Sequence, residues 1–419
     1  MNNIETKHER AVLAGLSAAC FEEGERSSEV SMAELSALVE TAGGEAVAWL
    51  IQSRPAPDPR SFIGDGKVQE MKKLIEDNGC DLAVFDNELS PSQMRVLTED
   101  LGVKVLDRSG LILDIFAQRA RTREGQLQVE LAQYKYLLPR LLGMWKHLER
   151  QEGAIGTRGP GETQLESDRR HIRRKISKLQ DELEEVRKVR AVQRRRREKN
   201  EIPVVALVGY TNAGKSTLLN RLTGSDIPAN DRLFDTLDTT TRHLRLDETN
   251  DVLLSDTVGF IRKLPTHLVE AFKATLEELR YADVLLHVID LSSPEWEAQA
   301  AVVDVLIREL EAEQTPCIRV YNKCDVFLGD LPRDKEGICV SARTGEGTDA
   351  LLQMISDVLA RGSRRAVFLI PFSQGALVRL LHEEAAVLRE DYVEDGTLVE
   401  AIVRPAVWGR LKDYVKETL

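Results

Sequence analysis

Residues 202–216 read IPVVALVGYTNAGKS, an apolar run that passes directly into a glycine-rich turn. The apolar part has the length and β-branched composition of a buried strand. From Gly209 to Ser216 the turn matches G-x-x-x-x-G-K-[S/T], in which backbone N–H groups wrap around phosphate and the following helix directs its positive end at the same anion. The stretch therefore predicts a nucleoside-triphosphate site between a strand and a helix. The loop residues expected to contact nucleotide are Gly209, Tyr210, Thr211, Asn212, Ala213, Gly214, Lys215 and Ser216.

Three residues of this loop have expected roles. Lys215 is placed to reach the β- and γ-phosphates, and the Ser216 hydroxyl is placed to ligate Mg²⁺. Asn212 has two interpretations: it either only shapes the loop or, as in some enzymes with this loop, helps to bind K⁺.

Shorter motifs follow in order, each after an apolar run that predicts a strand. Asp256 opens the first, where its carboxylate is expected to hold a water on Mg²⁺, while the N–H of Gly259 meets the γ-phosphate. In the second, Asp325 is expected to accept two hydrogen bonds from N1 and N2 of guanine, a pair that adenine cannot offer. Together the motifs predict GTP as the nucleotide. Their residues are Asp256, Thr257, Val258 and Gly259; Asn322, Lys323, Cys324 and Asp325; and Ser341, Ala342 and Arg343, which complete the base pocket.

Phe260 follows the first of these motifs, where Ras-type enzymes carry a glutamine that orients the attacking water. A phenyl ring cannot orient water. We therefore expect slow intrinsic hydrolysis that accelerates when a large partner orders the segments around the γ-phosphate.

The chain is long enough for several domains. Its patterns predict an α/β multidomain protein of four parts, namely two α/β domains separated by a helical part and followed by a small α+β domain. Residues 1–118 alternate strand and helix, with a capping box at Ser31–Glu34 that opens a helix ending near Thr41. Residues 200–365 alternate in the same way and predict a doubly wound Ras-like domain around the phosphate loop. Residues 366–419 predict a small α+β domain with helices over 373–390 and 406–416 and a hairpin across Asp395-Gly396.

Residues 119–199 have a different pattern, with apolar residues at steps of three and four in two long stretches. The glycine-rich segment 153–164 separates them, so the pattern predicts an antiparallel helical hairpin with an irregular tip. Pro139 is expected to bend the first helix. The second helix is basic: residues 169–199 hold 14 Lys or Arg against 5 Asp or Glu. Since the whole chain has a net charge of −12, this concentration indicates RNA phosphates as the partner, with a solvated helix face as the alternative.

Composition is that of an ordinary soluble protein, with 42% hydrophobic and 30% charged residues. No apolar run has the roughly 18–20 residues needed to cross a bilayer, and the N-terminal residues lack a signal-peptide pattern. We therefore expect a cytoplasmic protein without stable membrane insertion. The 5 cysteines show no C-x-x-C spacing, which argues against a zinc site or a disulfide framework.

Taken together, residues 200–365 resemble the translation-factor-related class of Ras-like GTPases, and nearly the full chain resembles the HflX family of ribosome-associated GTPases. The closer match is carried by Ile63–Lys67, the helix Leu127–Leu141, the loop Ile155–Glu166 with Asp168-Arg169-Arg170, and Phe234–Asp238. One departure is Thr239-Thr240, where the family usually has Pro-Thr.

The resemblance implies further roles. It implies a switch segment formed by Phe234, Asp235, Thr236, Leu237 and Asp238, with Thr236 as a Mg²⁺ ligand and Thr240 as a second candidate. We accordingly assign catalytic roles to Lys215, Thr236 and Gly259 and metal-binding roles to Ser216 and Thr236. It also implies that the hairpin and its tip enter the large ribosomal subunit near the peptidyl-transferase region, in rescue or splitting of stalled ribosomes or in subunit biogenesis. We expect a monomer and no DNA partner.

Three rival functions remain open at this point. An ATP-driven RNA-remodelling protein would use Gly64-Asp-Gly66-Lys67 as a second phosphate-binding turn, although a helix start explains the same residues. A GTP-dependent switch or scaffold would bind a protein through the coiled coil. A tRNA-modification GTPase would usually carry an additional Cys-bearing or folate-binding region, and the sequence shows none.

Overall fold

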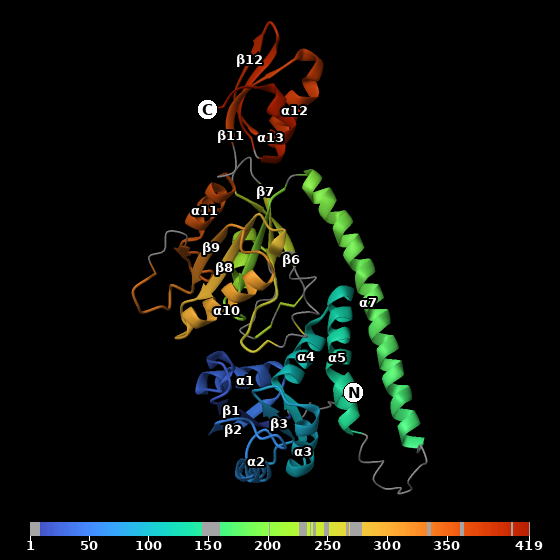
Figure 1. The fold of residues 1–419 in the computed structure, drawn as a ribbon. Helices are drawn as coiled ribbons and strands as arrows, with labels where there is room; N and C mark the ends of the chain where they lie inside the picture. The colour runs from blue at the N-terminus through green and yellow to red at the C-terminus, as the bar shows by residue number, and fades with distance from the viewer. Residues whose placement is uncertain are drawn as a thin grey trace, which may run out of the picture. The chain divides into compact units, whose positions relative to one another are not determined.

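The computed structural model describes residues 9–144, 160–200, 202–225, 233–234, 236–237, 240–246, 251–264, 268, 279–332, 337–360, 364–403 and 405–418. The chain divides into two compact units (Figure 1). The first unit contains residues 1–189 together with 229–238 and 258–276, and the second contains 190–228, 239–257 and 277–419. Two segments that the sequence places within 200–365 thus group with the N-terminal part. None of the helices in the described ranges is long and apolar enough to span a membrane.

The first unit is built on a parallel four-stranded sheet of order β2-β1-β3-β4. Its strands are β1 (Arg10–Ala18), β2 (Glu45–Arg54), β3 (Leu82–Phe85) and β4 (Lys104–Asp107). Every residue of β3 is buried, which is the pattern of a strand covered on both faces. The predicted alternation of strands and helices over this part is confirmed.

Helices cover both faces of this sheet (Figure 1). α2 (Asp65–Asn78) and α3 (Pro91–Leu101) pack on one face, where their apolar residues join those of β1 and β3 in one core cluster. α1 (Glu29–Thr41) and α4 (Arg108–Arg119) lie on the other face, and a short 3₁₀ helix, η1 (Glu23–Glu25), precedes α1. The predicted capping box at Ser31–Glu34 is wrong, because Ser28 is the N-cap and Ser31 is its partner at the third helical position.

Two long helices follow, α5 (Arg123–Met144) and α7 (Pro160–Asn200). Their shared apolar core contains Leu127 and Leu131 of α5 with Leu179 and Leu183 of α7. Ion pairs Arg123–Glu182 and Glu130–Lys175 join the helices in opposite chain directions, so the predicted antiparallel hairpin is confirmed.

The glycine-rich tip is shorter than the sequence indicates. Residues 160–164 belong to α7, which begins at Pro160 because proline, with its fixed φ and missing N–H, suits a first helical position. The rest of the predicted tip, residues 153–159, lies outside the described residues.

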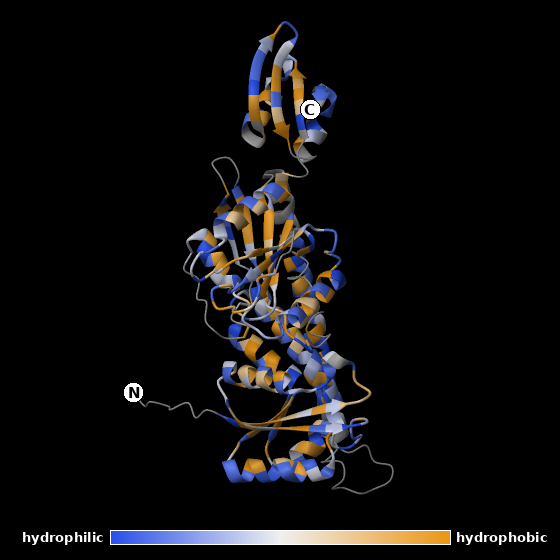
Figure 2. Ribbon diagram, turned by 90° about the vertical axis from the view of Figure 1, so that its left-hand side faces the viewer, coloured by the Kyte–Doolittle hydropathy of each residue, from blue (hydrophilic) through white to orange (hydrophobic). Residues whose placement is uncertain are grey.

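The second unit contains a six-stranded sheet of order β10-β9-β8-β5-β7-β6, parallel except for the antiparallel pair β6–β7. Figure 2 shows the hydrophobic colour concentrated on its central strands. α8 and α11 contribute to the main core cluster on one face, and α10 contacts β5 and β8. The strands are β5 (Val204–Gly209), β6 (Thr240–Arg245), β7 (Asp251–Asp256), β8 (Val284–Asp290), β9 (Cys317–Asn322) and β10 (Gly337–Cys339); the helices are α8 (Lys215–Thr223), α10 (Trp296–Glu309) and α11 (Thr348–Ala360).

The C-terminal part is an antiparallel sheet of order β12-β13-β11-β14 with α12 and α13 packed against its core. The predicted helix over 373–390 ends early, because residues from Ala386 onward pair with β13. Likewise, the predicted helix over 406–416 gives way to η3 and β14, which adds to the sheet edge. The elements are β11 (Arg364–Ile370), η2 (Phe372–Gln374), α12 (Gly375–Glu384), β12 (Ala386–Val393), β13 (Gly396–Val403), α13 (Pro405–Leu411), η3 (Lys412–Tyr414) and β14 (Val415–Thr418).

Candidate functional site

The phosphate loop joins β5 to α8 and has a conformation that its glycines permit. Gly214 has φ of +90°, and a Cβ there would lie 2.3 Å from Nδ2 of Asn322. A Cβ on Gly209 would lie 2.3 Å from the carbonyl oxygen of Val288, on the neighbouring strand β8. Asn212, at φ of +63°, takes the left-handed conformation that asparagine tolerates better than most residues. Both glycine positions therefore have a steric reason that is independent of nucleotide.

Lys215 is folded back into the loop. Its ammonium donates to the carbonyls of Gly209 at 3.2 Å and Tyr210 at 2.9 Å, and the residue is 6% exposed. Burial lowers the pKa of Lys215 to about 8, and the carboxylate of Asp256 opposes that shift. A buried cation that donates to two neutral carbonyls, with Asp256 as a nearby charge, is well placed to exchange those carbonyls for phosphate oxygens.

Ser216, a predicted metal ligand, meets Asp256, the residue expected to hold a water on the metal, at the carboxyl end of β7. The Ser216 hydroxyl donates to Oδ2 of Asp256 at 2.7 Å. One hydroxyl and one carboxylate are hard oxygen donors that suit Mg²⁺, so these residues fit the expected ion. Thr257, which follows, is fully buried and donates its hydroxyl to the carbonyl of Leu207 at 2.6 Å. It thus fixes the end of β7 against β5.

Asn322 connects the phosphate loop to the predicted base pocket. Its Nδ2 donates to the carbonyl of Ala213 at 2.8 Å, and its Oδ1 accepts from the backbone N–H of Ala342 at 3.0 Å. The side chain is 2% exposed. Asn322 thus links the ends of β9 and β10 to the loop after β5, and it does so through both ends of one amide.

The rest of the base pocket lies beside it. Asp325, the residue expected to read the edge of guanine, is exposed. Ser341 is buried and its hydroxyl accepts from the N–H of Thr344 at 3.1 Å, which closes the turn after β10. Burial raises the pKa of the Cys324 thiol, which keeps it protonated near neutral pH.

Two supporting residues of this pocket escaped prediction from the sequence. Asp290, at the end of β8, accepts from the ammonium of Lys323 at 2.6 Å. Arg221 of α8 donates to the carbonyl of Arg343 at 2.7 Å. An acidic residue at the end of a parallel strand is a signal that could have identified Asp290, whereas the sequence contains nothing that marks Arg221.

The predicted residues of the segments around Thr236 and Gly259 belong to the first unit, whereas Thr240, the second candidate for the Mg²⁺ ligand, begins β6 in the second unit. Phe234 and Leu237 are buried, and the ring of Phe234 packs edge-on against Phe116 with centroids 4.7 Å apart. Thr236 is half-buried. Val258 is 6% exposed and Phe260, two residues after it, is 1% exposed, with Gly259 between them. Asp235 and Asp238 lie outside the described residues.

The rival phosphate turn at Gly64 serves as the start of α2. Gly64 is the N-cap, its N–H donates to Oε1 of Gln52 at 2.8 Å, and a Cβ there would lie 3.0 Å from the guanidinium of Arg54. Lys67 pairs with Glu70 on the same helix at 2.8 Å. The turn is thus filled by the protein's own side chains, which favours the helix-start interpretation.

Three family models match the chain in succession. The model described as GTP-binding GTPase N-terminal matches residues 29–117, and the GTP-binding GTPase middle region matches 119–197. The model described as 50S ribosome-binding GTPase matches residues 204–323.

Curated relatives match nearly the full length. The GTPase HflX of Caldanaerobacter subterraneus subsp. tengcongensis is 46% identical over 415 residues, covering 99% of this chain and 96% of the relative. The GTPase HflX of Escherichia coli is 45% identical over 386 residues, covering 90% and 91%. Among solved structures, a GTP-binding protein of Sulfolobus solfataricus in complex with GDP is 26% identical, with a TM-score of 0.45, covering 84% of this chain and 98% of that one.

Proposed function

We propose, from the premise that this chain belongs to the HflX family of GTP-hydrolysing enzymes, that it binds the large ribosomal subunit and hydrolyses GTP faster there. The exposed basic stretch of α7 is the observation that carries the proposal. Arg170, Arg173 and Arg174 are all exposed on a helix whose opposite side is packed against α5. The description of the model matched by residues 204–323 supports a ribosomal partner.

The phosphate loop holds GTP through its backbone N–H groups and Lys215. On binding, the ammonium of Lys215 leaves the carbonyls of Gly209 and Tyr210 and pairs with the β- and γ-phosphates. Asn322 keeps the phosphate loop and the N–H of Ala342 at a fixed separation through its two hydrogen bonds. Asp325 accepts hydrogen bonds from N1 and N2 of guanine. The γ-phosphate is met by the N–H of Gly259.

Mg²⁺, when bound, neutralises charge that develops on the phosphates. Ser216 and Asp256 are the residues of the second unit that would hold it, Asp256 through a water, and Thr236 would supply a further ligand. For Asn212 the K⁺ role is tested by comparing turnover in KCl and NaCl, and equal rates would rule it out.

Water placement is the step that this chain does not complete by itself. Phe260 is buried and has no polar atom with which to orient the attacking water. Contact with the ribosome supplies that order by fixing the segments that carry Thr236 and Gly259, so docking and turnover are coupled.

The central experiment measures GTP turnover with and without purified large subunits. We expect stimulation that saturates with subunit concentration and weakens as salt is raised, because Arg–phosphate contacts release counterions. Unchanged turnover at saturating subunits would remove the ribosomal role and leave the GTPase assignment in place.

A matched pair of variants tests the role of α7. The test variant replaces Arg170, Arg173 and Arg174 by Gln. The control also introduces Gln, at three cations that pair with glutamates on the same helix: Lys178, Arg187 and Lys188. Each lost phosphate contact lowers the slope of log affinity against log salt by about 1, so the test variant is expected to lower it and the control to leave it nearly unchanged.

The biological outcome we propose is rescue of stalled ribosomes by subunit splitting, with subunit biogenesis as the alternative. Sedimentation of intact ribosomes incubated with the protein and a GTP analogue distinguishes the two. The RNA-remodelling rival predicts that Lys215→Ala retains ATP-dependent unwinding, and the scaffold rival predicts salt-insensitive binding to a protein and no stimulation by ribosomes.

A further inference from the structure

The sheet of the first unit has a topological switch point between β1 and β3. The chain moves from β1 to β2 on one side and continues through β3 and β4 on the other. Open parallel sheets bind their ligands beyond the carboxyl ends of the strands at such a point. Here Asp86 and Asn87 directly follow β3, and the backbone N–H of Asp86 donates to Ala14 of β1 at 2.8 Å.

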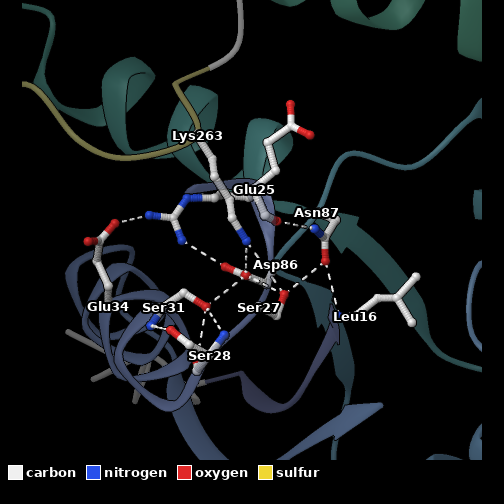
Figure 3. A network of polar contacts seen from close by, with 10 residues as sticks. Leu16, Glu25, Ser27, Ser28, Ser31, Glu34, Asp86, Asn87 and Lys263 are labelled. Atoms are coloured by element: carbon white, nitrogen blue, oxygen red, sulfur yellow. Dashed lines mark hydrogen bonds and ion pairs between the residues drawn. The ribbon is translucent and has the colours of Figure 1, made fainter. Parts of the chain in front are cut away.

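Asp86 is fully buried and is the centre of a polar network (Figure 3). Its carboxylate accepts from the hydroxyls of Ser27 at 2.6 Å and Ser31 at 3.0 Å. Arg108, the first residue of α4, donates to it at 2.8 Å and also pairs with Glu34 of α1. The network thus joins β3, α1 and α4.

Lys263 enters this network from a distant part of the sequence (Figure 3). Its ammonium pairs with Oδ2 of Asp86 and lies 3.5 Å from the hydroxyl of Ser27. The Lys263 side chain is 10% exposed. The place where an α/β domain usually binds a ligand is therefore taken by a lysine of the same chain, four residues after Gly259.

Lys263 supplies a second positive charge to a cluster in which acidic side chains outnumber basic ones. Asp86 and Glu34 pair with Arg108, and the carboxylate of Glu25 also acts on Lys263. Since a buried charge without a partner is strongly destabilising, removal of Lys263 leaves the cluster with an excess of negative charge. Burial lowers the pKa of Lys263, and the nearby carboxylate of Asp86 opposes that shift.

Backbone strain accompanies this contact. Lys263 has φ of +54°, a left-handed conformation that costs free energy for any residue with a Cβ. Phe234, in the predicted switch segment, has φ of +55° and packs on Phe116 of α4. Both segments are thus anchored to α4, one through Arg108 and Asp86 and the other through Phe116.

We propose that Lys263 is a built-in ligand of the Asp86 site and a positioning residue that holds Gly259 ready for the γ-phosphate. The contact makes the affinity for GTP relative to GDP depend on the first unit, because a tethered segment loses less conformational freedom when it closes on the nucleotide. This inference rests on the proposed assignment of Gly259 to the γ-phosphate.

The test uses Lys263→Met in the full chain, which removes the charge and keeps the length of the side chain. Affinities for a non-hydrolysable GTP analogue and for GDP are measured by titration with fluorescently labelled forms of the two nucleotides. Ordering even one residue carries an entropic cost that corresponds to roughly fivefold or more in affinity. We expect the analogue to bind weaker by about that factor and GDP to bind within about twofold of wild type. Lys73→Met, a charge removal at an exposed position of α2, is the control and leaves both affinities unchanged.

A double-mutant cycle with Asp86→Asn identifies the partner. If the contact acts as proposed, the double variant weakens analogue binding no more than Lys263→Met alone. If Asp86→Asn does not fold, hydrogen exchange of residues 258–264 in Lys263→Met replaces it, and faster exchange in the analogue complex is the expected result.

The outcomes separate this inference from the function on which it rests. Equal affinities of the wild type for GDP and the analogue would remove the role of Gly259. Normal discrimination in the wild type that Lys263→Met leaves unchanged would overturn the positioning role of Lys263 alone.

Discussion

Asn322→Ala removes the amide that joins the phosphate loop to the predicted base pocket, and its cost follows from the structure. Two buried hydrogen bonds are lost, the donation to Ala213 at 2.8 Å and the acceptance from Ala342 at 3.0 Å. Each is worth about 1 kcal/mol net, and a buried backbone group left without a partner costs about 1–3 kcal/mol. We expect the second unit to lose about 2–4 kcal/mol of its free energy of unfolding. Guanine nucleotide should bind at least about tenfold more weakly, which corresponds to about 1.4 kcal/mol.

The assay has two parts, urea unfolding followed by tryptophan fluorescence and titration with a fluorescent GDP. Trp296 packs edge-on against Tyr321 of β9, so its emission reports on the second unit. Asn78→Ala is the matched control, since it removes an amide that donates to Leu74 at 2.8 Å in the other unit. An Asn322→Ala protein that binds GDP within twofold of the wild type and unfolds at the same urea concentration would refute the bridging role.

Three further predictions concern single side chains. Asp325→Asn should shift preference from GDP toward XDP by about 100-fold or more, measured by competition, because the amide donates to the 2-oxo group of xanthine. Lys215→Met should lower single-turnover GTP hydrolysis by about 100-fold or more without unfolding the protein. Asp58→Asn should cost about 1–2 kcal/mol at pH 7, since backbone N–H groups of Arg60 and Ser61 and the guanidinium of Arg54 hold the pKa of Asp58 below its usual 3.8. That stability is present above the unfolded-state pKa and is lost as pH falls through the folded-state value, so the difference between the proteins in urea midpoints should shrink below pH 3.8.

Local chemistry made the strands that carry the motifs of the second unit predictable. The strand entering Gly209, the acidic residue ending β7 and the Asn-Lys-Cys-Asp run after β9 are short patterns whose spacing reflects contacts within a few residues. The hairpin was predictable for the same reason, because residues at steps of three and four lie on one helix face. The start of α1 was not, since both Ser28 and Ser31 suit a cap and only the hydrogen bonds of the folded helix distinguish them.

The remaining differences between prediction and structure arise from contacts between residues that are far apart in the sequence. Residues 386–390 have helical periodicity, but β13 offers them a hydrogen-bonded edge, and pairing prevails over local preference. Arg221 and Asp290 act on loops that the fold brings to them. Lys263 looks like an ordinary surface lysine in the sequence, and only the placement of Asp86, 177 residues earlier, gives it a buried partner.

The anchoring of Phe234 and Lys263 on α4 has a practical consequence for work with fragments of this chain. A fragment cut at the boundaries that the motifs suggest, residues 200–365, would expose the ring of Phe234 to water and leave Lys263 without Asp86. Its nucleotide affinities would describe a protein in which the segments around Phe234 and Lys263 have lost these contacts. The contacts and charges of the folded chain, rather than the order of its motifs, therefore decide which residues belong in one fragment. Comparing the nucleotide affinities of the fragment and the whole protein measures how much these contacts contribute.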